Sequence, residues 1–154
     1  MRRPGRETRL RRFAPLAVVA ALCLGAAPAP PTEKPPRKDD VPRAREAARS
    51  FLVPIDAGLY ADTWENAAAY TKSIVPKPAW ENGIRIIRSP LGDVRSRALK
   101  KSDYTRSLAG APIGEYVIVQ FETKFEKRPE PAAETVVTMR QKDGAWKVSG
   151  YFIQ

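Results

Sequence analysis

The sequence contains no histidine, and Cys23 is its only cysteine. The absence of histidine excludes Ser-His and Cys-His nucleophilic sites, and it removes the commonest general base and metal ligand. A single cysteine also excludes zinc sites that are built from several thiolates. Glycine patterns that bind phosphates or dinucleotides are missing as well. The sequence therefore predicts no metal and no cofactor, and it favours a protein that is not an enzyme.

The first 27 residues have the pattern of a secretory signal peptide. Six arginines and one glutamate lie in residues 1–12, and an apolar run over residues 13–27 follows them. The run is shorter than the roughly 20 residues that a membrane-spanning helix needs, and small residues and prolines come after it. We expect cleavage between Gly25 and Ala29, which removes Cys23, and an uncleaved N-terminal anchor is the alternative. The expected location is the periplasm or the cell exterior, with membrane contact only through an uncleaved segment.

The basic charge of the chain belongs in large part to this signal. The formal net charge is +10, and residues 1–27 account for +5 of it. No basic and aromatic pattern of a nucleic-acid-binding module is present, so we expect no nucleic-acid partner. Four arginines lie close together in sequence further along the chain, where they could bind an anion, although a solvated edge is the simpler interpretation: Arg85, Arg88, Arg95 and Arg97.

Residues 28–42 contain six prolines with charged residues between them. Such a composition predicts an extended, disordered linker. The remaining residues, 43–154, have the length of one domain. Without disulfides, a domain of this size depends on its hydrophobic core for stability.

Three segments after the linker have the apolar spacing of helices. The first contains Pro54, which should kink or end it. The second, residues 59–72, places Tyr60 and Trp64 on one stripe, and the third, residues 78–88, places Trp80 on its apolar side. The apolar side of the first segment is formed by Ala44, Ala47, Ala48, Phe51, Leu52 and Ile55.

Alternation predicts three strands in residues 114–154 and a charged edge strand at about residues 93–103. Asp143 and Gly144 are typical of a tight hairpin turn between the last two strands. If Gln141 lies opposite Trp146 across this turn, one face of the hairpin carries Val137, Met139, Trp146, Val148 and Phe152. One face of the preceding strand carries Val117, Val119, Phe121 and Phe125. Helices followed by strands predict an α+β domain, with two or three N-terminal helices packed on a four-stranded antiparallel meander.

A candidate site lies in the cup that such helices and sheet enclose. Asp56 could act as a base there, with Tyr60 or Tyr151 as hydrogen-bond donor and Trp64 and Trp80 as walls. The alternative is that Asp56 caps the second helix and the tryptophans are core residues. We expect the cup to be filled, because a cysteine-free domain needs its large aromatic residues in the core. The residues expected to fill it are Trp64, Trp80, Trp146 and Phe152.

Several motifs in order resemble those of a bacterial family. They are F-L-x-x-I-D-x-G-x-Y-x-x-x-W at residues 51–64, Trp80, R-S-P-L-G-D-V-R-S-R at residues 88–97, G-E-Y-V-I-V-Q-F at residues 114–121 and D-G-A-W-K-V-S-G-Y-F-I at residues 143–153. The chain resembles domain-of-unknown-function family 4019 over residues 43–154. The resemblance implies a bacterial exported domain and assigns no catalytic residue. The order of helices and strands is also similar to NTF2-like and cystatin-like folds.

These observations predict an exported bacterial protein that serves as a non-catalytic binding or accessory module of the cell envelope. Its partner would be an envelope protein or a small ligand. The alternative is a small-molecule-binding protein, or a small enzyme, that uses an NTF2-like pocket.

Overall fold

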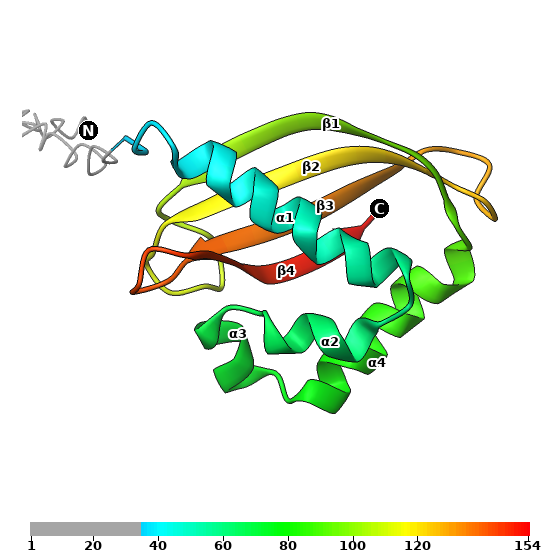
Figure 1. Ribbon diagram of the computed structural model, residues 1–154, viewed down its shortest axis with the longest axis horizontal. Coiled ribbons are helices and arrows are strands. Elements are labelled where there is room, and N and C mark those ends of the chain that lie inside the picture. The colour runs from blue at the N-terminus through cyan, green and yellow to red at the C-terminus, as the bar shows by residue number, and fades with distance from the viewer. Residues whose placement is uncertain (1–34) are drawn as a thin grey trace, which may run out of the picture. The chain divides into compact units, whose positions relative to one another are not determined.

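The computed structural model describes residues 35–154 (Figure 1). The predicted signal peptide, Cys23 and residues 28–34 of the predicted linker lie outside the described residues, whereas residues 40–42 of that linker form the start of α1. The elements in chain order are α1 (Asp40–Asp56), α2 (Tyr60–Glu65), α3 (Ala69–Ile74), α4 (Lys77–Arg88), a short 3-10 helix (Ser89–Leu91), β1 (Val94–Thr105), β2 (Tyr116–Phe125), β3 (Ala132–Arg140) and β4 (Trp146–Ile153).

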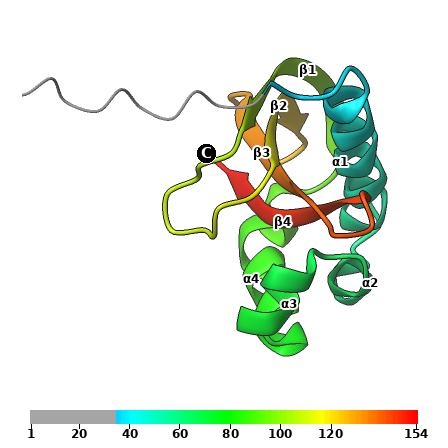
Figure 2. The ribbon, with the colours of Figure 1, turned by 90° about the vertical axis from the view of Figure 1, so that its left-hand side faces the viewer.

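The four strands form one antiparallel sheet in the order β1-β2-β3-β4, so each strand pairs with its neighbour in sequence. Helix α1 lies across one face of this sheet, while α2, α3 and α4 gather beyond the free edge of β4 (Figures 1 and 2). The predicted α+β class, the four-stranded meander and the charged edge strand β1 are confirmed.

The core lies between α1 and the sheet. Helix α1 buries Phe51, Leu52 and Ile55 against the alternate residues of β2 that the sequence places on one face. Pro54 lies inside α1, which ends shortly after it at Asp56. The buried face of β2 confirms the predicted set of Val117, Val119, Phe121 and Phe125.

The single helix predicted over residues 59–72 is wrong, because the structure divides it into α2 and α3. Between them, Ala67 forms a parallel bridge with Val148 at the edge of β4. The amide of Ala68 donates a hydrogen bond of 2.8 Å to the carbonyl oxygen of Val148. Pairing with a strand edge requires extended backbone, so it interrupts the helix despite the helix-forming alanines around it. The sheet is therefore preceded by four α-helices rather than two or three.

The predicted register of the β3–β4 hairpin is correct at one end and wrong at the other. Val137 lies opposite Gly150, as expected, but the register shifts there, and Thr138 lies opposite Val148. The shift is a β-bulge, in which one strand carries an extra residue. Its consequence is that Trp146 and Val148 share the core face with Tyr151, whereas the other face carries Val137, Met139 and Phe152.

Candidate functional site

Asp56, the predicted base, lies beside two guanidinium groups. Arg97 donates hydrogen bonds of 2.7 and 2.9 Å to its two carboxylate oxygens, and Arg88 donates a longer one of 3.3 Å. The other terminal nitrogen of Arg88 donates to the carbonyl oxygen of Gly92 at 2.6 Å. Both oxygens of Asp56 accept hydrogen bonds from arginine, so Asp56 forms ion pairs with Arg88 and Arg97. It does not cap α2.

Tyr151, one of the predicted donors, bonds to a glutamate that the sequence reasoning missed. Its hydroxyl donates to one carboxylate oxygen of Glu134 at 2.7 Å, and the hydroxyl of Thr123 donates to the other at 2.7 Å. The Nε of Arg97 donates to Glu134 at 2.6 Å, and the side chain of Glu134 is 0% exposed. Thr123 is also fully buried. A buried carboxylate thus receives a charged partner and two hydroxyl donors.

We call Asp56, Arg97, Glu134 and Tyr151 the buried ion network, after its buried carboxylate Glu134; Asp56, at its rim, is exposed. Burial raises the pKa of the Tyr151 phenol well above its ordinary value, and the negative charge of Glu134 adds to this effect. Burial alone would lower the pKa of the Arg97 guanidinium, but its hydrogen bonds to Asp56 and Glu134 raise it instead. Arg97 and Tyr151 therefore keep their protons at any physiological pH, which suits a structural role.

The remaining predicted site residues tie helices together. Tyr60 is buried, and the guanidinium of Arg85 lies 5.4 Å from the centre of its ring. The indole nitrogen of Trp64 donates to the carbonyl oxygen of Val75 at 2.9 Å. The indole nitrogen of the buried Trp80 donates to the hydroxyl of Thr63 at 2.8 Å, which joins α4 to α2. These residues surround the core near Asp56, but no hydrogen bond among them converges on a reacting group.

Two further expectations are wrong: that Phe152 fills the cup, and that all four arginines form a solvated edge. Phe152 does not fill the space between helices and sheet, because its side chain lies on the other face of the sheet and is 53% exposed. Trp80 and Trp146 are buried in the core, as expected, and Trp64 packs against it. The interpretation of the four arginines as a solvated edge is wrong for Arg88 and Arg97. Arg88 is buried, and its guanidinium carbon lies 4.9 Å from the centre of the Phe125 ring.

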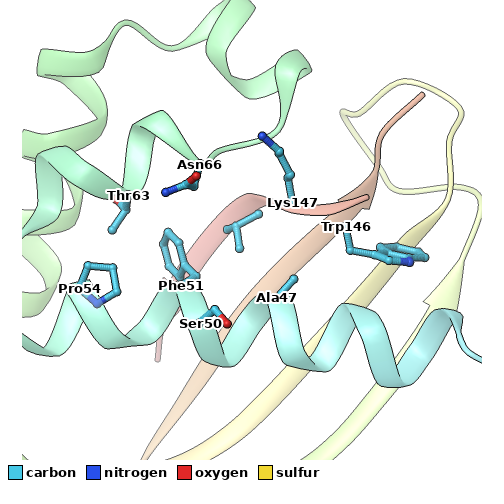
Figure 3. A pocket seen from close by; sticks show the side chains of 9 residues that line it. Ala47, Ser50, Phe51, Pro54, Thr63, Asn66, Trp146 and Lys147 are labelled. Carbon is cyan, nitrogen blue, oxygen red and sulfur yellow. The ribbon is translucent and has the colours of Figure 1, made fainter. Parts of the chain in front are cut away.

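The first of two hollows along β4, the α1–β4 pocket, has a volume of about 240 Å³. Its floor is apolar, with Phe51 and Val148, and polar side chains from three elements stand around it: Ser50, Asn66 and Lys147. Figure 3 shows α1 on one side of this pocket and Asn66 on the opposite side, with β4 between them. The ring of Trp146 points away from the other lining side chains (Figure 3).

The second hollow, the α4–β4 groove, has a volume of about 420 Å³. No lining residue is charged. The helical side contributes Val75, Ala79, Trp80, Gly83, Ile84 and Ile87, and the strand side contributes Tyr151, Phe152, Ile153 and Gln154. Ile87 and Phe152 are exposed. Neither this groove nor the α1–β4 pocket is lined by Asp56 or Glu134.

The described part of the chain contains neither a candidate metal site nor a candidate membrane span. Within residues 35–154, no group of three or more acidic, cysteine or histidine side chains is placed to hold a metal ion. In the same residues, no helix combines the length and the apolar character that crossing a membrane requires.

The described residues form a small α+β domain with helices on one face and beyond one edge of an antiparallel meander. The family described as "Protein of unknown function (DUF4019)" matches residues 47–151. The match covers more than half of the chain, so the chain belongs to this family, and the resemblance noted in the sequence is confirmed. No curated protein matches the chain.

Proposed function

We propose that the protein is an exported, non-catalytic binding module of the bacterial cell envelope. The observation that carries this proposal is the α4–β4 groove, where exposed apolar side chains border a hollow without charged residues. Exposed apolar surface of this kind is typical of sites that bind another protein, because covering it removes apolar area from water. We therefore place the partner-binding site at the groove.

The buried ion network supports the non-catalytic part of the proposal. A catalytic carboxylate needs access to substrate and a free oxygen at the reacting atom. Asp56 and Glu134 instead have their oxygens occupied by arginine and hydroxyl donors, and they line neither hollow along β4. The ion pairs and hydrogen bonds of these two acids thus hold α1, β1, β3 and β4 together.

The sequence of the N-terminal region supports the cellular part of the proposal. The predicted signal peptide would direct the chain to the periplasm or the exterior.

A second candidate function is the binding of a small molecule in the α1–β4 pocket. The observation that favours it is the set of polar side chains above an apolar floor, since Ser50, Asn66 and Lys147 have no hydrogen-bond or ion-pair partner within residues 35–154. A few polar groups that converge on an apolar hollow are characteristic of ligand sites. The volume of about 240 Å³ suits only a small ligand.

The two candidates are separated by photocrosslinking in the native host. A photoreactive phenylalanine analogue is placed at Ile87 in the groove, at Ser50 in the pocket, or at Arg49 on the exposed side of α1 as a control. We expect the periplasmic fraction to yield a discrete protein adduct from position 87 and none from position 49. The proposal would be contradicted if positions 49 and 87 gave adducts alike, or if the chain were recovered only from the cytoplasm. It would also be contradicted if a small molecule were bound at position 50 with no protein adduct at position 87.

A further inference from the structure

The free edge of β4 has a defined pattern of outward-facing backbone groups. Gln154 and Ala133 exchange two hydrogen bonds of 3.0 Å, so the backbone groups of Gln154 face β3. In an antiparallel pair this orientation alternates along the strand, so Phe152, opposite Thr135, also faces β3. The amides and carbonyls of Tyr151 and Ile153 therefore point away from the sheet, and no group within residues 35–154 bonds to them.

The earlier part of the same edge already pairs with an extended segment. Ala67 bridges to Val148, and the amide of Ala68 donates to the carbonyl oxygen of Val148 at 2.8 Å. In the described residues this pairing stops before Tyr151, where the α4–β4 groove begins. The open stretch thus continues an edge that is able to accept backbone hydrogen bonds from a neighbour.

Helix α4 presents two small residues to the groove beside this open stretch, among larger ones such as Trp80 and Ile84. Ala79 and Gly83 line the groove, and a Cβ atom placed on Gly83 would have no neighbour within 4 Å. Glycine in the interior of a helix costs about 0.5–1 kcal/mol relative to alanine, and no close packing requires it at this position. The missing side chain therefore contributes space to the groove rather than stability to the helix.

From these observations we propose that an extended, uncharged segment of a partner protein enters the α4–β4 groove and pairs with Tyr151 and Ile153 as a fifth strand of the sheet. This proposal rests on the proposed function and specifies how the groove binds its partner. The outward amides and carbonyls of β4 bond to the backbone of the segment, and its alternate apolar side chains contact Ile87 and Phe152. Because no side chain that lines the groove is charged, a charged side chain inside it would lose its hydration without gaining an oppositely charged side chain.

A single strand fits this site better than a second copy of the chain. Helix α4 lies beyond the edge of β4 (Figure 2). If two β4 edges paired across a twofold axis, each α4 would have to occupy the space taken by the other copy's sheet. An isolated extended segment has no such flanking helix, so it can lie between β4 and α4.

The test is a selection of short random peptides, displayed on phage, against the described domain. We expect the selected peptides to share a central stretch that has alternating apolar residues and no charged residue. Synthetic versions should bind at least about tenfold more weakly when the amides that face β4 are N-methylated, because each methylated amide loses its backbone hydrogen bond to β4. This comparison needs no protein variant, so it does not depend on the folding of a mutant.

Two protein variants and two controls locate the binding. Gly83→Leu should reduce peptide affinity at least about tenfold by filling the groove, whereas Gly83→Ala should bind normally. Ile153→Pro removes an outward amide, which an edge strand tolerates, and should weaken binding similarly. Lys147→Met, in the other hollow, should leave binding unchanged.

Several results would overturn the proposal. The selected peptides could be charged or helical, or their affinity could fail to respond to N-methylation. Gly83→Leu and Gly83→Ala could bind equally well, or the chain could form a dimer that Ile153→Pro abolishes. If position 87 crosslinks a protein in the periplasm but its capture does not respond to Ile153→Pro, the proposed function stands and strand addition is wrong. If position 87 crosslinks nothing, the proposed function itself fails.

Discussion

Replacement of Arg97 by alanine should lower the free energy of unfolding by about 3–5 kcal/mol, the usual cost of leaving one charge of a buried pair without its partner. Arg97 is the cation that contacts Glu134, whose side chain is 0% exposed, and it also donates two hydrogen bonds to Asp56. Arg88 would still pair with Asp56, but Glu134 would keep only the hydroxyls of Thr123 and Tyr151. Urea denaturation followed by circular dichroism measures the change.

Arg95→Ala is the matched control for this prediction. Arg95 lies on the same strand and contacts Glu126 at 2.8 Å, but both side chains are exposed. An exposed pair contributes about 0–1 kcal/mol, so the control should shift the denaturation midpoint little. In the double variant Arg97→Met with Glu134→Gln, part of the loss should return because no buried charge remains unpaired. Equal losses for Arg95→Ala and Arg97→Ala would show that Glu134 is not buried as described.

Trp146→Ala should destabilise the domain by about 3–5 kcal/mol, which is typical of deleting a large buried aromatic side chain. Trp146 is 7% exposed and belongs to the core cluster that α1 covers. Its indole nitrogen is buried and has no hydrogen-bond partner among the described residues, so the expected loss comes from apolar burial and the cavity that remains. Thermal and urea denaturation both report this change.

The neighbouring Lys147→Ala provides the comparison on the same strand. The side chain of Lys147 has no ion-pair or hydrogen-bond partner within residues 35–154, so its replacement should cost less than about 0.5 kcal/mol. A loss for Lys147→Ala as large as that for Trp146→Ala would mean that the two residues are not on the faces of β4 that the structure assigns to them.

The strands could be located from the sequence because alternation and the Asp143–Gly144 turn signal are local features. The β-bulge could not be foreseen, since an extra residue in one strand leaves little trace in composition. It changes which side chains share a face, and for this reason Trp146 and Phe152 were placed together but lie on opposite faces. The helix break at residues 66–68 escaped prediction because its cause, the edge of β4, is distant in sequence.

The structure joins two of the predicted site residues, Asp56 and Tyr151, but the sequence did not indicate what they contact. Asp56 and Tyr151 belong to one network because Arg97 and Glu134 connect them. A signal for Glu134 does exist in the sequence, since it shares the alternation of β3 with the apolar Ala132 and Val136. A charged residue at a core-facing position needs a buried partner. The sequence alone did not identify Arg97 as that partner, because the pairing depends on how β1 and β2 align.

Amide hydrogen exchange along β4 tests most directly whether this edge is open for binding. We expect the amides of Gly150 and Phe152, which face β3, to exchange slowly, and those of Tyr151 and Ile153 to exchange at least about tenfold faster in the free domain. The open edge would be contradicted if the amides of Tyr151 and Ile153 were protected in the absence of any partner, or if they exchanged more slowly than those of Gly150 and Phe152.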